Sequence, residues 1–292
     1  MRLRSVELEV PDPGAAAAFL ASTWGLLDAG SRNGVSYLRG SEPLPYVVSL
    51  AKADTCAITA VTFSGAAPEV AQARSRASLA GAGVGPMRAF DEPGGAEGFV
   101  LEGPEGQVFR LVCDGDRVEK LPTDRDCPLQ VTHVVINARD REACTRFLIE
   151  VLGFRLSDRT GFMNFIRCDD VHHAIAYAQS GISSLNHIAF EMKDFDAVMR
   201  GIGRLKDAGF APAWGPGRHG PGNNVFAYFV TPFGATVEYT AEVQRIGDDY
   251  KVGAPEDWIW PPNRVDHWGV SGRDSAALSE AEKRFRFRKP VM

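Results

Sequence analysis

The chain lacks any run of 18 apolar residues, and its opening segment, MRLRSVELEV, turns polar after Val10. We therefore expect neither a membrane span nor a signal peptide, and we expect the protein to be cytoplasmic. Cysteine is scarce: its 5 residues are an odd number, widely spaced, with no Cys-x-x-Cys pair. This pattern favours reduced thiols over a disulfide framework, and it argues against zinc held by thiolates.

Large basic clusters are also absent. A net charge of −5 over 292 residues gives no electrostatic footprint for nucleic acid, so we expect no such partner. The basic tail EKRFRFRKP (282–290) is interpreted as a solvated or subunit-contacting terminus. With 45% hydrophobic residues, the chain can bury one large core or two cores of ordinary domain size.

The two halves of the chain resemble copies of one small domain. An offset of 128 residues aligns PDPGAAAAFL (11–20) with RDREACTRFL (139–148). In the middle of the domain an offset of 127 fits better and places Phe63 on Phe190, which a one-residue difference in loop length explains. A period this long indicates duplication of a whole domain rather than a solenoid.

This duplication divides the chain into three parts. We expect an N-terminal repeat over 1–118, a C-terminal repeat over 128–245 and a C-terminal extension over 246–292. The linker is expected over 119–126, EKLPTDRD, because this segment combines a proline with several charges and has no apolar period.

Hydrophobic periodicity predicts an α+β fold for each repeat. In the second repeat we expect strands over 129–137, 162–168, 172–178, 186–192, 224–230 and 236–242, and helices over 141–153 and 195–210. Gly25 and Gly153 follow the first helix of each repeat as stop signals. The segment GPGRHGPGNN (215–224) has too many turn formers for a strand interior, so His219 is expected on a loop.

Histidine is missing from the first repeat. All 6 histidines lie after it: His133, His172, His173, His187, His219 and His267. Two of them, His133 and His187, and also Glu238, align with positions at which the first repeat has no comparable metal ligand. The counterparts in the first repeat are Ser5, Ala60 and Arg110.

His133, His187 and Glu238 therefore form a candidate metal site. Side chains alternate along strands, so all three can point into the concave face of one curled sheet. Two neutral imidazoles and one carboxylate on one side of a metal ion leave the other side open, an arrangement typical of non-haem Fe(II) that takes substrate and oxygen. We expect Fe(II), and the same ligands accept Mn(II). A guanidinium at Arg110 would repel a metal ion, so the first repeat is expected to be a metal-free scaffold.

The pattern over about residues 1–245 resembles the type I extradiol ring-cleavage dioxygenases of the vicinal oxygen chelate superfamily, the glyoxalase, bleomycin resistance and dioxygenase group. In that family a histidine lies about 14 or 15 residues before the second ligand, and a glycine-rich loop carries another. A tyrosine lies ten residues before the ligand glutamate. The matching residues here are His173, His219 and Tyr228. The chain departs from the family at 231–234, where Thr-Pro-Phe-Gly replaces the usual Asp-Pro-x-Gly.

This resemblance implies a fold and an activity. The fold would be two tandem vicinal-oxygen-chelate domains, each a pair of βαβββ modules that curl a mixed sheet around a metal cleft. The activity would be opening of a catechol ring with O2, as in the catabolism of aromatic compounds. His173 would be the acid–base residue, and His219 with Tyr228 would hydrogen-bond a substrate oxygen. Family members usually form homo-oligomers, so we expect one here. Independently of the resemblance, successive strand residues face opposite sides, so His172 is expected to point away from the site.

Three other functions stay open. A glyoxalase-type isomerase would typically use more carboxylate ligands and share them between modules. A hydroxyphenylpyruvate-type dioxygenase has the same two histidines and one glutamate but does not require His173, His219 and Tyr228. A metal-free protein that binds aromatic compounds would need no ligands at all. The segment 254–268, with three tryptophans and three prolines, is expected to lie extended on the surface near the site, with His267 structural.

Overall fold

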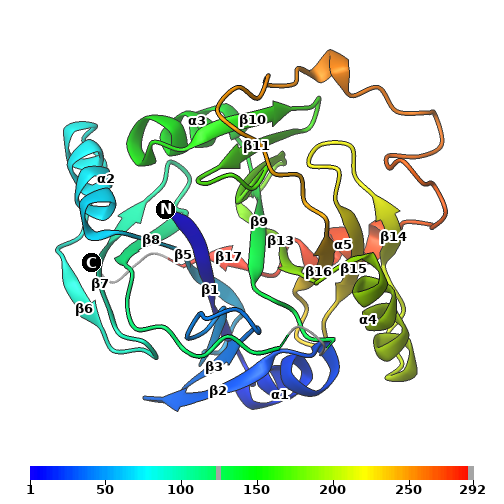
Figure 1. The fold of residues 1–292 in the computed structure, drawn as a ribbon, viewed down its shortest axis with the longest axis horizontal. Coiled ribbons are helices and arrows are strands. Elements are labelled where there is room, and N and C mark those ends of the chain that lie inside the picture. Colours follow the sequence, from blue (N-terminus) through cyan, green and yellow to red (C-terminus); the bar gives the residue numbers. More distant parts are fainter. Residues whose placement is uncertain (123–125, 289–292) are drawn as a thin grey trace.

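The computed structural model describes residues 1–122 and 126–288, which form two curled sheets with helices at their edges (Figure 1). Residues 123–125 of the expected linker and the end of the basic tail lie outside the described residues. Among the described residues, no helix is long and apolar enough to cross a membrane.

The first sheet is built by the N-terminal repeat and has the order β2-β3-β4-β1-β5-β8-β7-β6. Its strands are β1 (Arg2–Val10), β2 (Leu27–Arg32), β3 (Val35–Arg39), β4 (Val48–Lys52), β5 (Ala57–Gly65), β6 (Arg88–Phe90), β7 (Ala96–Glu102) and β8 (Val108–Cys113). Its helices are α1 (Pro13–Phe19), continued by a π-helical turn over Leu20–Trp24, and α2 (Ala67–Leu79).

The second sheet repeats this arrangement with the order β10-β11-β12-β9-β13-β16-β15-β14. Its strands are β9 (Val131–Ala138), β10 (Arg155–Arg159), β11 (Met163–Arg167), β12 (Ile175–Gln179), β13 (Ser184–Glu191), β14 (Trp214–Arg218), β15 (Val225–Val230) and β16 (Thr236–Ala241). Its helices are α3 (Arg141–Phe147), continued by a π-helical turn over Leu148–Leu152, and α4 (Phe195–Asp207).

The predicted duplication is confirmed by this shared strand order. Each sheet consists of two βαβββ modules, which is the predicted α+β fold of tandem vicinal-oxygen-chelate domains. The register agrees with the alignment of the repeats, because Arg110 pairs with Thr62 across β8 and β5 as Glu238 pairs with Ala189 across β16 and β13. Residues that the alignment equates therefore occupy equivalent places in the two sheets.

The predicted helix stops at Gly25 and Gly153 are also confirmed. Both glycines have left-handed backbone angles, with φ of 96° and 74°, which other residues adopt only with strain. The helix α3 also begins at Arg141, as predicted. Asp12 and Asp140 cap the two helices, because each accepts a hydrogen bond from a backbone N–H of the first turn.

Each repeat packs part of its helical region against the other repeat. The indole of Trp24 is fully buried and stacks on Tyr239, with ring centroids 3.7 Å apart. In the opposite direction, the guanidinium of Arg76 donates to the carbonyls of Val151 and Leu152. These contacts join the repeats through a shared core, so the first repeat packs against the second.

The prediction that residues 215–224 form a loop and no strand was wrong in part. β14 includes residues 215–218 of this segment, although His219 follows the strand and lies on the loop as expected. β14 is the edge strand of its sheet, and Pro216 lies where the pairing with β15 is irregular, between Trp214 and Gly217. Edges and bulges tolerate a proline. β10 was not predicted.

The basic tail is solvated only in part: its described basic residues from Lys283 to Arg288 are exposed, but its backbone is tied to the first sheet. Phe285 is buried, and β17 (Arg286–Phe287) pairs in parallel with β5 of the first sheet. Before it, helix α5 (Ser275–Ala281) packs Leu278 against the second sheet. The C-terminal extension therefore crosses from the second sheet to the first.

Candidate metal centre

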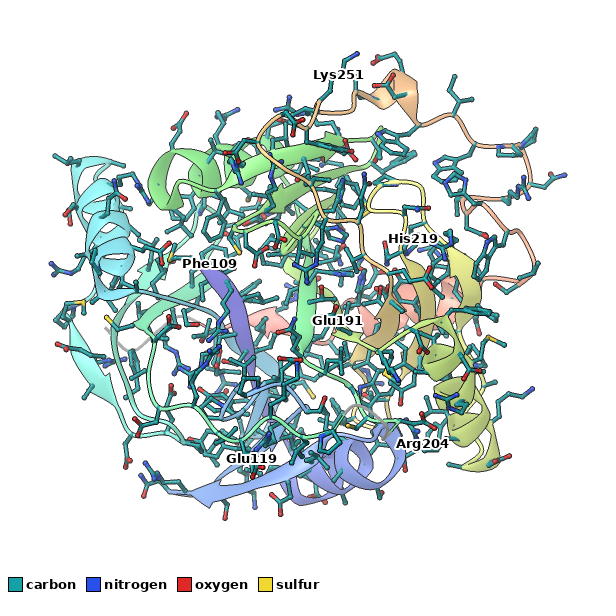
Figure 2. All side chains as sticks on the ribbon, viewed as in Figure 1. Phe109, Glu119, Glu191, Arg204, His219 and Lys251 are labelled. Atoms are coloured by element: carbon teal, nitrogen blue, oxygen red, sulfur yellow. The ribbon has the colours of Figure 1, made fainter. Side chains whose placement is uncertain are left out.

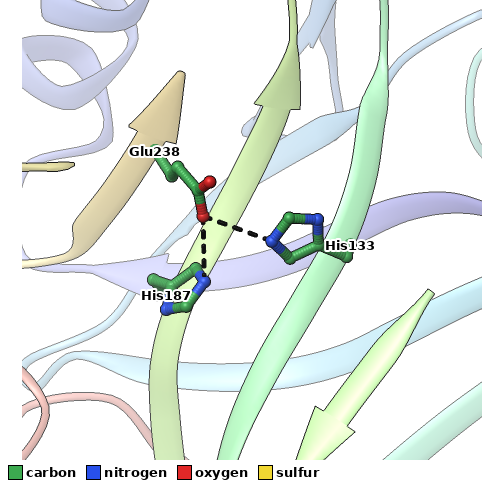
Figure 3. A group of neighbouring side chains, drawn as sticks. All are labelled: His133, His187 and Glu238. Carbon is green, nitrogen blue, oxygen red and sulfur yellow. Dashed lines mark hydrogen bonds and ion pairs between the residues drawn. The ribbon is translucent and has the colours of Figure 1, made fainter. Parts of the chain in front are cut away.

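His133, His187 and Glu238 meet on three adjacent strands, β9, β13 and β16 (Figure 3). The Nε2 atoms of His133 and His187 lie 3.2 Å and 3.1 Å from Oε2 of Glu238. All three side chains are buried, and their ligand atoms lie within 4.8 Å of one another. Among residues 1–122 and 126–288 this is the only such group of three.

These separations suit one metal ion. Nitrogen and oxygen ligands at about 2.1 Å from a metal, in adjacent positions of an octahedron, are themselves about 3 Å apart. The distances of 3.2 Å and 3.1 Å match that spacing. The arrangement can therefore hold a divalent ion between Oε2 of Glu238 and the two imidazoles.

A chain of hydrogen bonds fixes the tautomer of His187. Asn137 donates its Nδ2–H to the carboxylate of Glu282 (3.3 Å), so its Oδ1 accepts from Nδ2 of Asn186 (2.9 Å). The Oδ1 of Asn186 then accepts from Nδ1–H of His187 (2.7 Å). A neutral imidazole protonated at Nδ1 carries a lone pair at Nε2.

The lone pair of His187 consequently faces a carboxylate oxygen. Nε2 of His187 is buried and has no hydrogen-bond partner among the described residues, although Oε2 of Glu238 is 3.1 Å away. Two acceptors this close in a dry site are unfavourable unless a cation lies between them. The pair is therefore arranged for a bound cation rather than for a hydrogen bond.

The protonation states also suit metal binding. Burial lowers the pKa of His133, which keeps its imidazole neutral. Burial raises the pKa of Glu238, but the contact of its Oε2 with Nε2 of His133 outweighs this effect and holds that pKa below its ordinary value. Asn224 donates to Oε1 of Glu238, which leaves Oε2 for the centre. Neutral histidines and an ionised carboxylate are the ligating forms.

His173 lies beside this group. Its ring centroid is 4.2 Å from that of His133, and it precedes β12 rather than lying within it. Burial lowers the pKa of His173 well below its ordinary value, and neighbouring imidazoles lower it further. A neutral imidazole beside the centre can accept a proton from a bound molecule.

The expectation that His172 points away from the site was wrong. The strand begins at Ile175, so the alternation of side chains along strands does not apply to His172. The residue is fully buried, with Nδ1 3.0 Å from Nδ1 of His173 and Nε2 2.7 Å from Oδ2 of Asp158. Neither this contact nor Asp158 was predicted from the sequence.

His219 and Tyr228 form a pair next to His187. Nε2 of His219 lies 2.8 Å from the hydroxyl of Tyr228, whose ring centroid is 4.9 Å from that of His187. Burial lowers the pKa of His219 to about 4 and raises the pKa of Tyr228. Both side chains are thus neutral near pH 7 and can exchange hydrogen bonds with a ligand oxygen.

The C-terminal extension reaches the loop that carries His219 (Figure 2). The ring of Trp260 lies so close to Gly220 that a Cβ there would be 2.5 Å from it, and Trp258 packs beside it. His267 is exposed, and its backbone N–H donates to the carbonyl of Arg218. The tryptophan-rich segment therefore packs on the His219 loop.

The equivalent place in the first repeat holds an ion-pair network. Arg110, the counterpart of Glu238, contacts Glu7 at 2.9 Å and Glu92 at 2.8 Å. Arg4 contacts the other oxygen of Glu92 at 2.8 Å, and the hydroxyl of Tyr46 donates to Glu92. The carboxylates are used by guanidinium groups, so this repeat presents cations where the second repeat presents ligands.

Residues 130–239 match the family model described as Glyoxalase/Bleomycin resistance protein/Dioxygenase superfamily. Metapyrocatechase 2 of Cupriavidus necator is 29% identical over 193 residues, which are 63% of this chain and 54% of that protein. 2,2',3-Trihydroxybiphenyl dioxygenase of Sphingomonas paucimobilis is 30% identical over 43% of this chain and 47% of that protein. The chain thus spans about half the length of the curated relatives it matches.

Solved structures match over a greater length. The Mn(II)-bound glyoxalase from Novosphingobium aromaticivorans is 34% identical, with a TM-score of 0.87 over 95% of this chain and 93% of that one. The 2,3-dioxygenase LapB from Pseudomonas sp. KL28 shares the fold, with a TM-score of 0.80 at 19% identity over 88% of this chain and 98% of that one. The chain therefore belongs to the Glyoxalase/Bleomycin resistance protein/Dioxygenase superfamily.

Proposed function

We propose that this protein is an extradiol-type dioxygenase that opens the ring of a catechol-type substrate with O2 at Fe(II). Its metal ligands would be His133, His187 and Glu238. The observation that carries the proposal is the lone pair of His187 that faces Glu238 at 3.1 Å. Three further polar side chains, those of His173, His219 and Tyr228, lie beside this group. The names of the curated relatives, which include an iron-dependent extradiol dioxygenase of Rhodococcus jostii, support the same reaction class.

Fe(II) bound to these three ligands on one side would supply open positions at which a diol and dioxygen could meet. The residues around it would handle protons and orientation. His173, neutral and buried, would accept a proton from a substrate hydroxyl and later return it. His219 and Tyr228, already paired at 2.8 Å, would hydrogen-bond a substrate oxygen and fix the ring in one orientation.

A glyoxalase-type reaction is the second candidate, and one observation favours it. The solved structure that is 34% identical over nearly the whole chain is named as a glyoxalase with Mn(II). Against it, the three ligands here come from a single repeat, and the first repeat uses its carboxylates in ion pairs. A metal-free binding protein is disfavoured by the two facing acceptors, and a hydroxyphenylpyruvate-type enzyme would not require His173 as an acid–base residue.

We also propose the division into a scaffold repeat over 1–118, a catalytic repeat over 128–245 and an extension over 246–292. We further propose that the protein is a homo-oligomer and that it is cytoplasmic. Light scattering at micromolar concentration tests the oligomer, and a monomer would contradict it.

The experiment that separates the two reactions uses protein purified without oxygen and loaded with Fe(II) or Mn(II) in parallel. Each form is given a panel of substituted catechols with O2, and separately the hemithioacetal of methylglyoxal and glutathione. A yellow ring-opened product with oxygen uptake supports the dioxygenase. Isomerisation of the hemithioacetal without oxygen uptake would support the glyoxalase instead. His133→Ala should abolish either activity, whereas the exposed His267→Ala should not.

A further inference from the structure

Three buried side chains form a chain that leads to the metal centre. Oδ2 of Asp158 lies 2.7 Å from Nε2 of His172, and Nδ1 of His172 lies 3.0 Å from Nδ1 of His173. Asp158 and His172 are fully buried, and His173 is nearly so. His173 in turn packs against the ring of His133.

The carboxylate of Asp158 sets the direction of every proton in this chain. A carboxylate only accepts, so Nε2 of His172 carries the proton that points to it. A neutral His172 then has its lone pair at Nδ1, and the contact to His173 requires Nδ1–H of His173 to donate. His173 is left with a lone pair at Nε2, the nitrogen that is not used by the chain.

The C-terminal extension holds Asp158 in this role. The backbone N–H of Gly253 donates to its Oδ1 at 2.7 Å, and the hydroxyl of Tyr250 lies 3.3 Å and 3.2 Å from its two oxygens. Tyr250 also packs edge-on against the ring of His172, with centroids 5.9 Å apart. An extension outside both repeats thus fixes the first member of the chain.

We propose that Asp158 and His172 are positioning residues that hold His173 as the Nδ1–H tautomer, and that the extension keeps them aligned through Tyr250 and Gly253. This tautomer presents a basic nitrogen for the substrate proton. The role of Nε2 of His173 as acceptor of the substrate proton rests on the proposed function, whereas the tautomer of His173 does not.

Asp158→Asn tests the proposal with almost no change in shape. Because the N–H of Gly253 can bond only to an acceptor, the amide oxygen of the new side chain must face Gly253. Its NH2 group must then face His172, which inverts the chain and leaves His173 protonated at Nε2. Asp248→Asn is the matched control, because Asp248 is exposed and its side chain bonds, within the described part of the chain, only to Arg155.

The direct readout is the ring nitrogen signals of histidine in protein labelled with 15N and loaded with Zn²⁺ as a diamagnetic probe. His173→Asn and His172→Asn assign the signals by their loss. We expect Nδ1–H on His173 and Nε2–H on His172 in the wild type and in Asp248→Asn, and the reverse in Asp158→Asn. Nε2–H on His173 in the wild type, or an unchanged tautomer in Asp158→Asn, would overturn the proposal. The wild-type spectrum decides alone if Asp158→Asn does not fold.

Turnover gives an independent readout. A His173 of the wrong tautomer should lower kcat by about 10²- to 10⁴-fold, with metal content unchanged, because the cost is that of losing a positioned base. His172→Gln, which supplies one donor and one acceptor, should retain more activity than His172→Leu, and equal loss in both would contradict the positioning role. A wild type with the expected tautomer but no ring cleavage would remove the proposed function and leave the tautomer chain intact.

Discussion

Nε2 of His187 and Oε2 of Glu238 face each other at 3.1 Å with no hydrogen bond between them, because Asn186 has already engaged the single N–H of a neutral His187. Glu238→Gln replaces one of the two acceptors with a donor. In metal-free protein this variant should therefore be at least as stable as the wild type. With metal, only the wild type should gain stability, because the ion binds the native state.

Thermal unfolding of both proteins, with and without added Fe(II) or Mn(II), measures this difference. A wild type that is insensitive to metal, or a variant that gains as much as the wild type, would remove Glu238 from the ligands.

Asn186→Ala should weaken metal binding by about 10- to 100-fold, the usual cost of losing a group that orients a histidine ligand. Without the amide oxygen, His187 is free to adopt either tautomer or to rotate. Competition with a chelator measures the affinity. Asn33→Ala, at an exposed turn in the first repeat, is the control and should leave the affinity unchanged.

His173→Asn should retain metal and bind a catechol but lower kcat by about 10²- to 10⁴-fold, because it removes a positioned acid–base group. Metal analysis, substrate binding without oxygen and steady-state turnover separate these effects. Normal turnover by His173→Asn would reject the acid–base role. The buried contact of His172 with His173 means that His172→Asn should also be slow.

The metal-free protein should lose stability as the pH falls below about 6.5. Burial lowers the pKa of His133 and His173 in the folded state, and lowers that of His219 to about 4. The unfolded chain then binds more protons than the folded one between about pH 6.5 and 4, so acid favours unfolding.

Urea unfolding at several pH values measures how steeply the free energy of unfolding depends on pH. His219→Gln should make this dependence shallower. A free energy of unfolding that does not change between pH 6.5 and 4 would contradict the neutral states assigned to the buried histidines.

Much of the fold could be predicted from the sequence, because the same pattern of strands and helices occurs in both repeats. The alignment that set His187 against Ala60 and Glu238 against Arg110 also describes the register of the two sheets. The contrast between the repeats singled out the three candidate ligands before their distances were known. β14 was hidden because an edge strand can carry the glycines and proline that would break a central one.

The hydrogen-bond chains around the centre could not be predicted in the same way. Asp158 meets Gly253 from 95 positions away, and Asn137 meets Glu282 from 145 positions away. Contacts over such separations leave no periodic pattern in the local sequence. Both also involve the extension, for which the first repeat has no counterpart. His172 was misplaced because an assumed strand began three residues too early, so the alternation of faces was applied where no strand exists.

Oxygen stoichiometry tests the central claim most directly. Fe(II)-loaded protein prepared without oxygen is mixed with a catechol that it binds, and 18O2 is then added. We predict one O2 consumed per ring opened, with both labelled atoms in a ring-opened product, and no reaction in Glu238→Gln. A metal-loaded protein that binds catechols yet consumes no O2, while isomerising a hemithioacetal, would contradict the assignment as a dioxygenase.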